Sequence, residues 1–182
     1  MSAIRLLGIC GSLRRASANR GLLRAASEQL AAGVDMQIAD LTDIPFYNAD
    51  TPEKTPAVKR VLDQIESAHA LVLASPEYNY SMAPALKNIL DWASREADNR
   101  LLNGKTAAIL GAGGGMGTSR SQYHLRQVCV CLNLHVLNKP EVFVNAFTGH
   151  FNEEGDLVDD AMRAQVAEQM RELVVLTRKL HA

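Results

Sequence analysis

The segment from residue 11 to residue 20 has the composition of an anion-binding turn. Its polar side chains include Ser12, Arg14, Arg15, Ser17 and Asn19. The hydroxyl and amide groups are donors around a turn that opens onto a helix amino terminus, and an arginine can form paired hydrogen bonds with phosphate. Four or five such bonds, each worth about 1.5–3 kcal/mol, would hold a phosphomonoester without a metal ion. We therefore predict a phosphate site here; an ordinary turn with Ser17 or Asn19 as a helix cap is the alternative.

Two other phosphate-binding motifs do not occur in the sequence. A P-loop needs Gly-x-x-x-x-Gly-Lys followed by Ser or Thr, and no segment has this pattern. A dinucleotide-binding fingerprint needs Gly-x-Gly-x-x-Gly after the first strand, but the next glycine after Gly11 is Gly21. Asp40 stands where a ribose-binding acid would stand, and without those glycines it indicates little.

A second candidate segment, residues 75–84, places two tyrosines between two prolines. Its candidate binding residues are Pro76, Glu77, Tyr78, Asn79, Tyr80 and Ser81. Aromatic faces and backbone N–H groups suit a flat heteroaromatic ring. Pro84 stiffens the end of the segment, and Ser81 is near enough to the next helix to cap it. We expect Glu77 to have a positional role, and we predict no side chain as a catalytic acid or base. The alternative for Tyr78 and Tyr80 is that they are ordinary surface tyrosines.

The third candidate segment is the glycine-rich run from Gly111 to Gly117. Met116 stands where the dinucleotide fingerprint would have its last glycine. Small residues let the backbone approach a ligand closely, and we expect the run Gly113, Gly114 and Gly115 to do so. A flexible turn whose glycines serve only packing is the alternative.

These three segments follow predicted strands. Apolar runs predict strands at residues 4–10, 36–39, 70–75 and 106–112, with a weaker fifth at 141–144. Apolar residues at helical spacing lie between them, and this alternation predicts a parallel sheet covered on both faces. Five strands favour an α/β, doubly wound, flavodoxin-like sheet of order 2-1-3-4-5, in which ligands bind beyond the carboxyl ends of the strands. No linker or repeat interrupts the pattern, so we expect one domain over residues 1–182.

Composition argues against several classes of function. A formal net charge of -1 and a pI near 6.5 provide no field that would attract nucleic acid or an anionic membrane. No apolar run reaches the ~18 residues of a membrane span, and no signal-peptide pattern follows the first strand, so we expect a cytoplasmic protein. The histidines show no metal-ligand spacing, so no metal site is predicted. Cys10, Cys129 and Cys131 are interpreted as buried, reduced thiols.

Four segments occur in the order found in one enzyme family. They are residues 11–19, residues 76–81, the Leu-Lys-Asn-Ile-Leu-Asp-Trp run at 86–92 and the Gln-Tyr-His-Leu-Arg-Gln run at 122–127. Through them the sequence resembles the NAD(P)H-dependent FMN reductase family, particularly its quinone and chromate reductase branch. The resemblance implies that Ser12, Arg14, Ser17 and Asn19 bind the FMN phosphate and that residues 76–81 surround the isoalloxazine edge. Gly113–Gly115 would complete the ring site, although many relatives carry a hydroxyl residue there.

The resemblance also implies a reaction and partners. NADPH or NADH would transfer hydride to flavin N5 and leave, and a quinone or another acceptor, such as chromate or an azo or nitro compound, would then take two electrons in a ping-pong cycle. The family forms homodimers and homotetramers, with Arg120, Tyr123 and Glu141 as interface residues. A solvated helix face and an ordinary strand start are the alternative for these three.

Three functions stay open on the sequence. They are an FMN-containing reductase of quinones, a flavin reductase that releases reduced FMN to a partner, and a flavodoxin-type electron carrier. The near-neutral charge argues against the carrier, because proteins that dock redox partners display strong single-sign fields. The choice between NADH and NADPH is not determined by the sequence.

Overall fold

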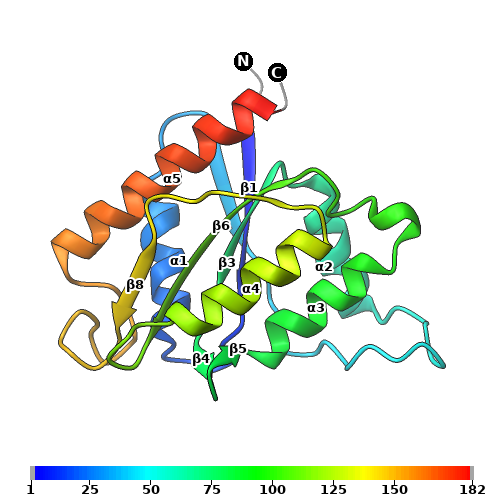
Figure 1. Ribbon diagram of the computed structural model, residues 1–182, viewed down its shortest axis with the longest axis horizontal. Helices are drawn as coiled ribbons and strands as arrows, with labels where there is room; N and C mark the ends of the chain where they lie inside the picture. Colours follow the sequence, from blue (N-terminus) through cyan, green and yellow to red (C-terminus); the bar gives the residue numbers. More distant parts are fainter. Residues whose placement is uncertain (1–2, 181–182) are drawn as a thin grey trace.

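The protein is built around a parallel sheet with helices on both faces, seen in Figure 1. The computed structural model describes residues 3–180. β1 (Ile4–Cys10) pairs with β2 (Val34–Ile38) on one side and with β3 (Ala70–Ala74) on the other, and β3 pairs with β6 (Thr106–Gly113). The predicted flavodoxin-like arrangement is confirmed, but its fifth position is shared. β7 (His135–Val136) and β8 (Val142–Asn145) pair with successive parts of β6.

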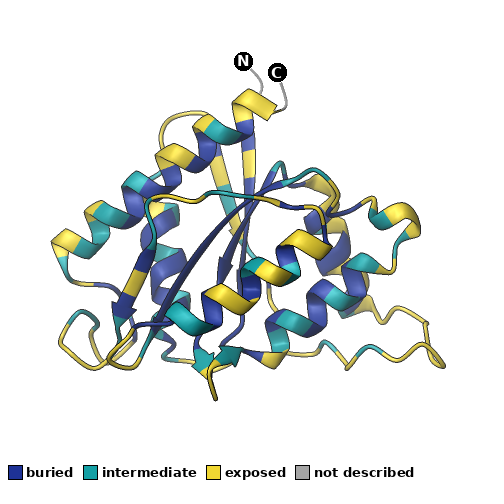
Figure 2. Ribbon diagram, in the orientation of Figure 1, coloured by how far each residue is buried: buried dark blue, intermediate teal, exposed yellow. Residues whose placement is uncertain are grey.

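Five α-helices cover the sheet within the described residues (Figure 1). Side chains of α1 (Ala18–Glu28) and α5 (Asp160–Leu180) join one hydrophobic cluster with one face of the strands. Those of α2 (Pro56–Ser67), α3 (Pro84–Ser94) and α4 (Ser119–Cys131) join the other. A 3₁₀ turn, η1 (Ala97–Asn99), follows α3. Figure 2 shows the consequence, with the central strands buried and each helix buried along one side.

Local sequence signals explain where α1 and α2 begin. Ser17 precedes α1 and its hydroxyl accepts a hydrogen bond from the Arg20 N–H at 3.3 Å. Thr55 serves α2 in the same way, with Pro56 in the first helical position where its missing N–H costs nothing. All five residues of β3 are buried, as an apolar run inside a doubly covered sheet requires.

Two short pairings were not predicted from the sequence. β4 (Glu77–Tyr78) and β5 (Ser81–Met82) form an antiparallel hairpin inside the second candidate segment. The two residues at its tip, Asn79 and Tyr80, have φ angles of 50° and 67°, the left-handed conformation of a tight hairpin turn. The usual glycine is missing from this turn, so the sequence did not indicate it. β7 was missed because two residues are too few for an apolar pattern.

The prediction that all three cysteines are buried is wrong for Cys131. Cys10 and Cys129 are buried, and burial raises the pKa of the Cys129 thiol to about 12. Cys131 is exposed because it lies two residues further along α4, on the outer face of its last turn.

Loops that follow the strands gather at one end of the sheet, the lower end of Figure 1.

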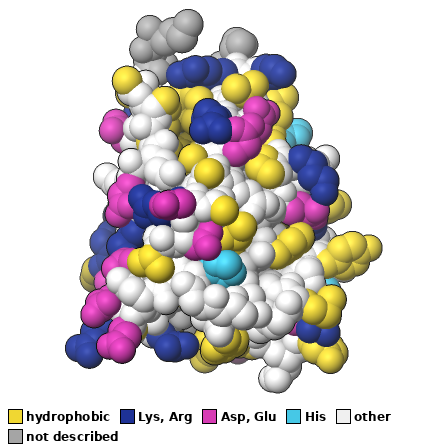
Figure 3. Space-filling view, turned by 90° about the vertical axis from the view of Figure 1, so that its left-hand side faces the viewer, with side chains coloured by type: hydrophobic (Ala, Val, Ile, Leu, Met, Phe, Trp, Pro, Cys, Tyr) yellow, Lys and Arg dark blue, Asp and Glu magenta, His cyan; other side chains and the backbone are white. Residues whose placement is uncertain are grey.

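Among residues 3–180, no helix has the length and apolar content needed to cross a membrane. Acidic and basic side chains are interspersed over the side shown in Figure 3. Arg163 of α5 forms an ion pair with Glu28 of α1 at 2.9 Å. Arg24 of α1 forms another at 2.5 Å with Asp156, in the loop before α5.

Candidate functional site

A groove of about 410 Å³ lies at the carboxyl ends of the strands, between the loops that follow β1, β3, β6 and β8. We call it the main groove. Ser12, Arg14, Ser17 and Asn19 line it from the loop after β1. Pro76, Glu77 and Tyr78 line it from the loop after β3, and Gly113 and Gly114 from the end of β6. The structure therefore brings the three sequence-predicted segments to one place.

The loop after β1 presents buried hydroxyl groups to the main groove. Ser12 and Ser17 are 6% and 2% exposed, and the first turn of α1 begins directly behind them. The side chain of Arg14 is exposed at the rim. Cys10 lies below this loop, where burial raises the pKa of its thiol and its Sγ donates to the Ser12 carbonyl at 3.5 Å. This end of the groove combines hydroxyls, a guanidinium and a helix amino terminus, which is a donor set for a phosphate.

Asn19 has a structural task that its place in the sequence did not reveal. Its Nδ2 donates to the Ala112 carbonyl at 2.8 Å, and the Ala112 N–H donates to its Oδ1 at 2.9 Å. Both ends of the amide are thus paired with the last part of β6. Asn19 fixes the loop after β1 against the glycine-rich segment, and only its second amide hydrogen remains available to a ligand.

The loop after β8 contributes a wall that sequence reasoning missed. Ala146, Phe147, Phe151, Asn152, Glu153 and Gly155 line the main groove from this loop. A Cβ at Gly21 would lie 1.8 Å from the Gly155 carbonyl oxygen, and Gly155 itself has a φ of +81°. The two glycines let this loop press against the start of α1. A glycine inside the helical pattern of residues 18–28 was the signal that could have indicated this close approach.

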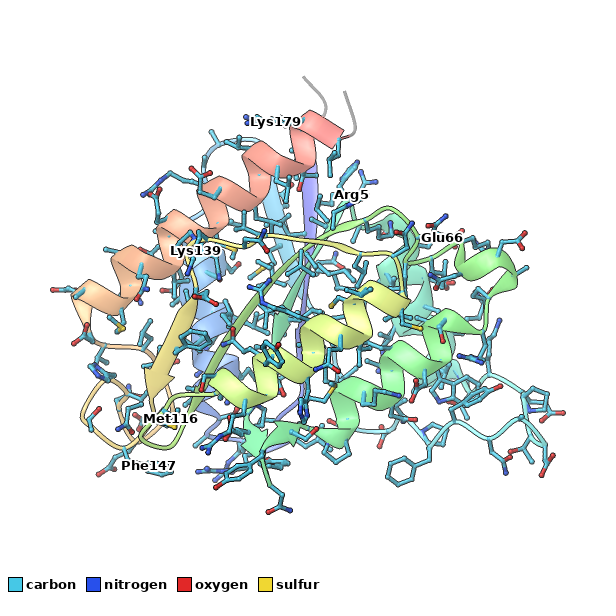
Figure 4. The ribbon with its side chains drawn as sticks, viewed as in Figure 1. Arg5, Glu66, Met116, Lys139, Phe147 and Lys179 are labelled. Atoms are coloured by element: carbon cyan, nitrogen blue, oxygen red, sulfur yellow. The ribbon has the colours of Figure 1, made fainter. Side chains whose placement is uncertain are left out.

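Figure 4 shows Phe147 and Met116 at the same lower end of the molecule, while Arg5 and Lys179 lie toward the opposite end. The Ala146 N–H donates to the Gly113 carbonyl at 2.7 Å, which joins the loop after β8 to the glycine-rich segment. Phe147 is largely exposed although it lines the groove.

Glu77 is the residue that holds the loop after β3 in place. Its Oε2 accepts from the backbone N–H groups of Arg120 and Ser121 at 3.1 and 3.2 Å, and its Oε1 accepts from Arg120 Nε at 2.8 Å. The carboxylate therefore stabilises the positive end of α4 as well as an arginine. The Arg120 guanidinium lies 3.8 Å from the centre of the Tyr80 ring, so the hairpin is clamped at its tip as well as at its base.

The expectation that Ser81 caps the helix after it is wrong. α3 begins at Pro84 behind Ala83, and no side chain caps it. The Ser81 hydroxyl instead contacts His124 Nδ1 at 3.2 Å, because β5 turns it toward α4. The Ala83 N–H donates to the Ser75 hydroxyl at 3.0 Å.

The glycine-rich segment contains two kinds of glycine. A Cβ at Gly113 would lie 2.5 Å from the Gly117 carbonyl oxygen, so packing within the protein requires a glycine there. A Cβ at Gly114 or Gly115 would meet nothing within 4 Å. Because Gly114 lines the main groove, its open side leaves room for a flat ligand close to the backbone. Gly115, together with Asn79, Tyr80 and Ser81, is not among the residues that line the groove.

The three predicted interface residues lie outside the main groove. Arg120 is engaged by Glu77, whereas Tyr123 is 70% exposed on the same helix. Glu141 precedes β8 and forms an ion pair with Lys139 at 2.5 Å. Within residues 3–180, no cluster of three or more His, Cys, Asp and Glu side chains could hold a metal ion.

A second cavity of about 430 Å³ adjoins the main groove. The two share Arg14 and Tyr78. Its further walls come from the loop after β2 and from the start of α3.

Comparison with known proteins places this architecture in a family. The sequence pattern of the NADPH-dependent FMN reductase family matches residues 4–149. The chain is 46% identical over 180 residues to an NAD(P)H-dependent FMN reductase of Pseudomonas aeruginosa, covering 97% of each protein. It is 34% identical over 165 residues to a quinone reductase of Escherichia coli, covering 85% of this chain and 88% of that protein.

A solved structure shows the same fold. The flavoenzyme NAD(P)H:(acceptor) oxidoreductase of Paracoccus denitrificans superimposes with a TM-score of 0.87 at 24% identity, covering 97% of this chain and 98% of the other. The family membership follows from the sequence relatives. The protein is an oxidoreductase and belongs to the NADPH-dependent FMN reductase family.

Proposed function

We propose that the protein holds FMN in the main groove and uses NADH or NADPH to reduce quinones. The observation that carries the proposal is that the two ends of one groove differ in chemistry. Buried hydroxyls at a helix amino terminus face one end, and open backbone at Gly114 faces the other. A nucleotide with an anionic tail and a flat ring has this pair of needs.

The phosphate end supports FMN through the chemistry of its donors. We assign the phosphate to Ser12, Arg14 and Ser17, with the second amide hydrogen of Asn19 as a further donor. Hydrogen bonds to a charged group are worth about 1.5–3 kcal/mol each, enough for tight binding without a metal. Ser12 and Ser17 are nearly buried, and the Ser17 hydroxyl is also held by the Arg20 N–H, so these side chains have little conformational freedom to lose when a ligand binds.

The ring end supports FMN through space and backbone. We assign the isoalloxazine to the region between Pro76–Tyr78 and Gly113–Gly114, where backbone groups rather than side chains would meet its polar edge. Four of the predicted residues would not contact the ring but would shape the hairpin and the glycine turn: Asn79, Tyr80, Ser81 and Gly115. The Glu77–Arg120 pair fixes this wall, which makes Glu77 a positioning residue.

The chemistry that FMN supplies when bound is two-electron transfer. The overall reaction breaks the C4–H bond of NAD(P)H and turns the two carbonyl groups of a quinone into hydroxyls, with one proton taken from water. Quinones are proposed as acceptors because relatives with 34–44% identity over most of the chain carry that activity in their names. Chromate and azo or nitro compounds are proposed as further acceptors, since a groove open to solvent does not select strongly among them.

We propose that donor and acceptor use the same open side of the groove in turn. Parallel lines in double-reciprocal plots at several quinone concentrations are expected, and intersecting lines would contradict the shared site. We also propose that the protein is a homodimer or homotetramer that uses Arg120, Tyr123 and Glu141, which sedimentation of the wild type and of Tyr123→Ala tests directly.

The decisive experiment separates a bound cofactor from a substrate. Purified protein is loaded with FMN, dialysed extensively and assayed with NADH and NADPH against a quinone panel. Retained yellow colour and quinone reduction without added flavin are expected. If the colour is lost and free FMN behaves as a saturable substrate, the protein is a flavin reductase instead.

A further inference from the structure

The second cavity has an apolar character that the main groove lacks. Its walls carry the apolar side chains Leu13, Leu41, Ile44, Phe46, Pro84 and Ala85. Its volume of about 430 Å³ is within the usual range for small-molecule pockets, and it opens beside Arg14 and Tyr78. A molecule in the main groove and a molecule in this cavity would therefore be neighbours.

The outer wall of this cavity is firmly held. The Pro45 carbonyl accepts from Asn88 Nδ2 at 2.8 Å and from Trp92 Nε1 at 2.9 Å. The Tyr47 N–H donates to Asn88 Oδ1 at 2.8 Å, and the Tyr47 ring packs edge-on against Trp92 with centroids 5.1 Å apart. The loop after β2 is thus tied to α3 on both sides of a single residue, Phe46.

Phe46 is 79% exposed although both of its neighbours are anchored. Leu13 and Tyr78, which line the same cavity, are also exposed. Exposed apolar side chains grouped around a concave surface mark binding sites, whereas a single one does not. Anchoring at Pro45 and Tyr47 reduces the conformational freedom that Phe46 would lose when a ligand packs on it. The structure therefore presents an aromatic ring at the mouth of the cavity.

We propose that the second cavity binds the apolar, ring-substituted side of a quinone acceptor and that Phe46 determines the preference among quinones. This inference rests on the proposed function, because it assigns a place to the acceptor of that same reaction. A quinone with a fused ring or methyl groups reaches Leu13, Ile44 and Phe46, whereas a bare quinone ring does not extend as far. The reacting carbonyl end stays at the boundary with the main groove, near Tyr78.

The test compares four FMN-loaded proteins: wild type, Phe46→Ala, Phe46→Tyr and Val130→Ala. Val130 is the matched control, since it is also 79% exposed but lies on α4 away from the cavity. Oxidised protein is titrated with menadione by calorimetry in the absence of NAD(P)H, so that binding is measured without turnover. In parallel, kcat/KM is measured with menadione and with para-benzoquinone.

Phe46→Ala is expected to weaken menadione binding about tenfold, because one aromatic contact is lost. Its kcat/KM ratio for menadione over para-benzoquinone should fall by a similar factor. Phe46→Tyr keeps the ring and should restore both values to within about twofold, as should Val130→Ala. Each variant should keep the wild-type melting temperature.

Unchanged menadione binding and an unchanged ratio in Phe46→Ala would overturn the inference while leaving the proposed function intact. An equal loss of menadione binding in Val130→Ala would also overturn it, because any exposed apolar side chain would then have the same effect. A changed sedimentation coefficient of Phe46→Ala that accompanies the loss would overturn it too, because this face would then be a contact with a second copy of the chain. If wild-type protein reduces neither quinone with NADH or NADPH, the proposed function itself fails, which is a different result.

Discussion

The two ends of the main groove are built by different means. At the end assigned to the phosphate, short side chains that follow one strand line the groove, and Ser17 also caps the helix behind it. At the end assigned to the ring, the shape of the backbone depends on distant residues, such as Glu77 bound to Arg120. The first end is local in sequence and the second is not. Substitutions should therefore act on ligand affinity directly at the first end and through loop geometry at the second.

The largest effect is expected for Ser17→Asp. Aspartate keeps the helix cap, so the fold should be maintained, while a negative charge replaces a phosphate donor. Affinity for FMN should fall about 100-fold, which corresponds to one charge-assisted bond and added repulsion. Titration of apoprotein by quenching of flavin fluorescence measures this. Thr51→Asp adds the same charge in an exposed loop and should have no effect; wild-type affinity in Ser17→Asp would remove the phosphate assignment.

A smaller effect is expected for Gly114→Ala at the ring end. Its Cβ would meet no protein atom within 4 Å, so thermal stability should not change, but it would enter the space assigned to the isoalloxazine. Affinity for FMN should fall about tenfold, a loss of about 1.4 kcal/mol. The matched control is Gly113→Ala, whose Cβ would lie 2.5 Å from a carbonyl oxygen and should lower the melting temperature. A stable Gly114→Ala protein with full affinity would place the ring elsewhere.

Glu77→Gln tests whether the ring end depends on positioning. The ion pair and part of the cap on α4 are lost, and stability should fall by about 1 kcal/mol because Glu77 is largely buried while Arg120 is partly exposed. FMN affinity should fall only about threefold, through a loosened hairpin. Denaturant unfolding and FMN titration measure the two quantities. A double-mutant cycle with Arg120→Gln should show coupling, and strict additivity would mean that the two side chains act independently.

The smallest effect concerns the thiols. Cys131 is exposed, whereas Cys10 is buried at the end of β1 and Cys129 is buried in α4. Burial raises the pKa of both buried thiols, so the folded protein keeps them protonated. Native protein should react with a thiol reagent at Cys131 first, and Cys131→Ser should abolish the rapid phase without changing FMN affinity. A persistent rapid phase in that variant would show that one of the inner cysteines is accessible.

This raised pKa of Cys129 has a consequence for stability at high pH. The folded pKa of about 12 lies above the ordinary value of 9.0, so the folded state holds the proton more strongly than the unfolded state. The stabilising contribution is present below about pH 9 and is lost as pH rises toward 12. Cys129→Ala should therefore lose less stability than wild type between these pH values, and parallel pH profiles would contradict this.

Much of the fold, and the place of the loop after β1 in the groove, could be predicted because the signals are local. The run from Ile4 to Cys10 and the polar turn after it lie next to each other in the sequence, and the rule that ligands bind at the carboxyl ends of parallel strands placed the three segments together. Ser17 caps α1 and also lines the main groove. The role as a helix cap and a role in ligand binding are therefore compatible.

The remaining features could not be predicted because they depend on contacts between distant segments. Asn19 pairs with Ala112, 93 positions away, which no local pattern indicates. The loop after β8 approaches α1 through backbone at Gly21 and Gly155, without a side-chain signature. The hairpin tip at Asn79 and Tyr80 adopts a left-handed turn without glycine and is supported by Arg120 on another helix.

The central claim is that one end of the groove binds a phosphate and the other a flavin ring. Its most direct test is to measure the affinities of FMN and riboflavin for wild type, Ser17→Asp and Gly114→Ala, since riboflavin lacks only the phosphate. We predict that wild type prefers FMN by about 100-fold, that Ser17→Asp loses this preference by weakening FMN alone, and that Gly114→Ala weakens both ligands equally. Equal binding of FMN and riboflavin by the wild type would contradict the account.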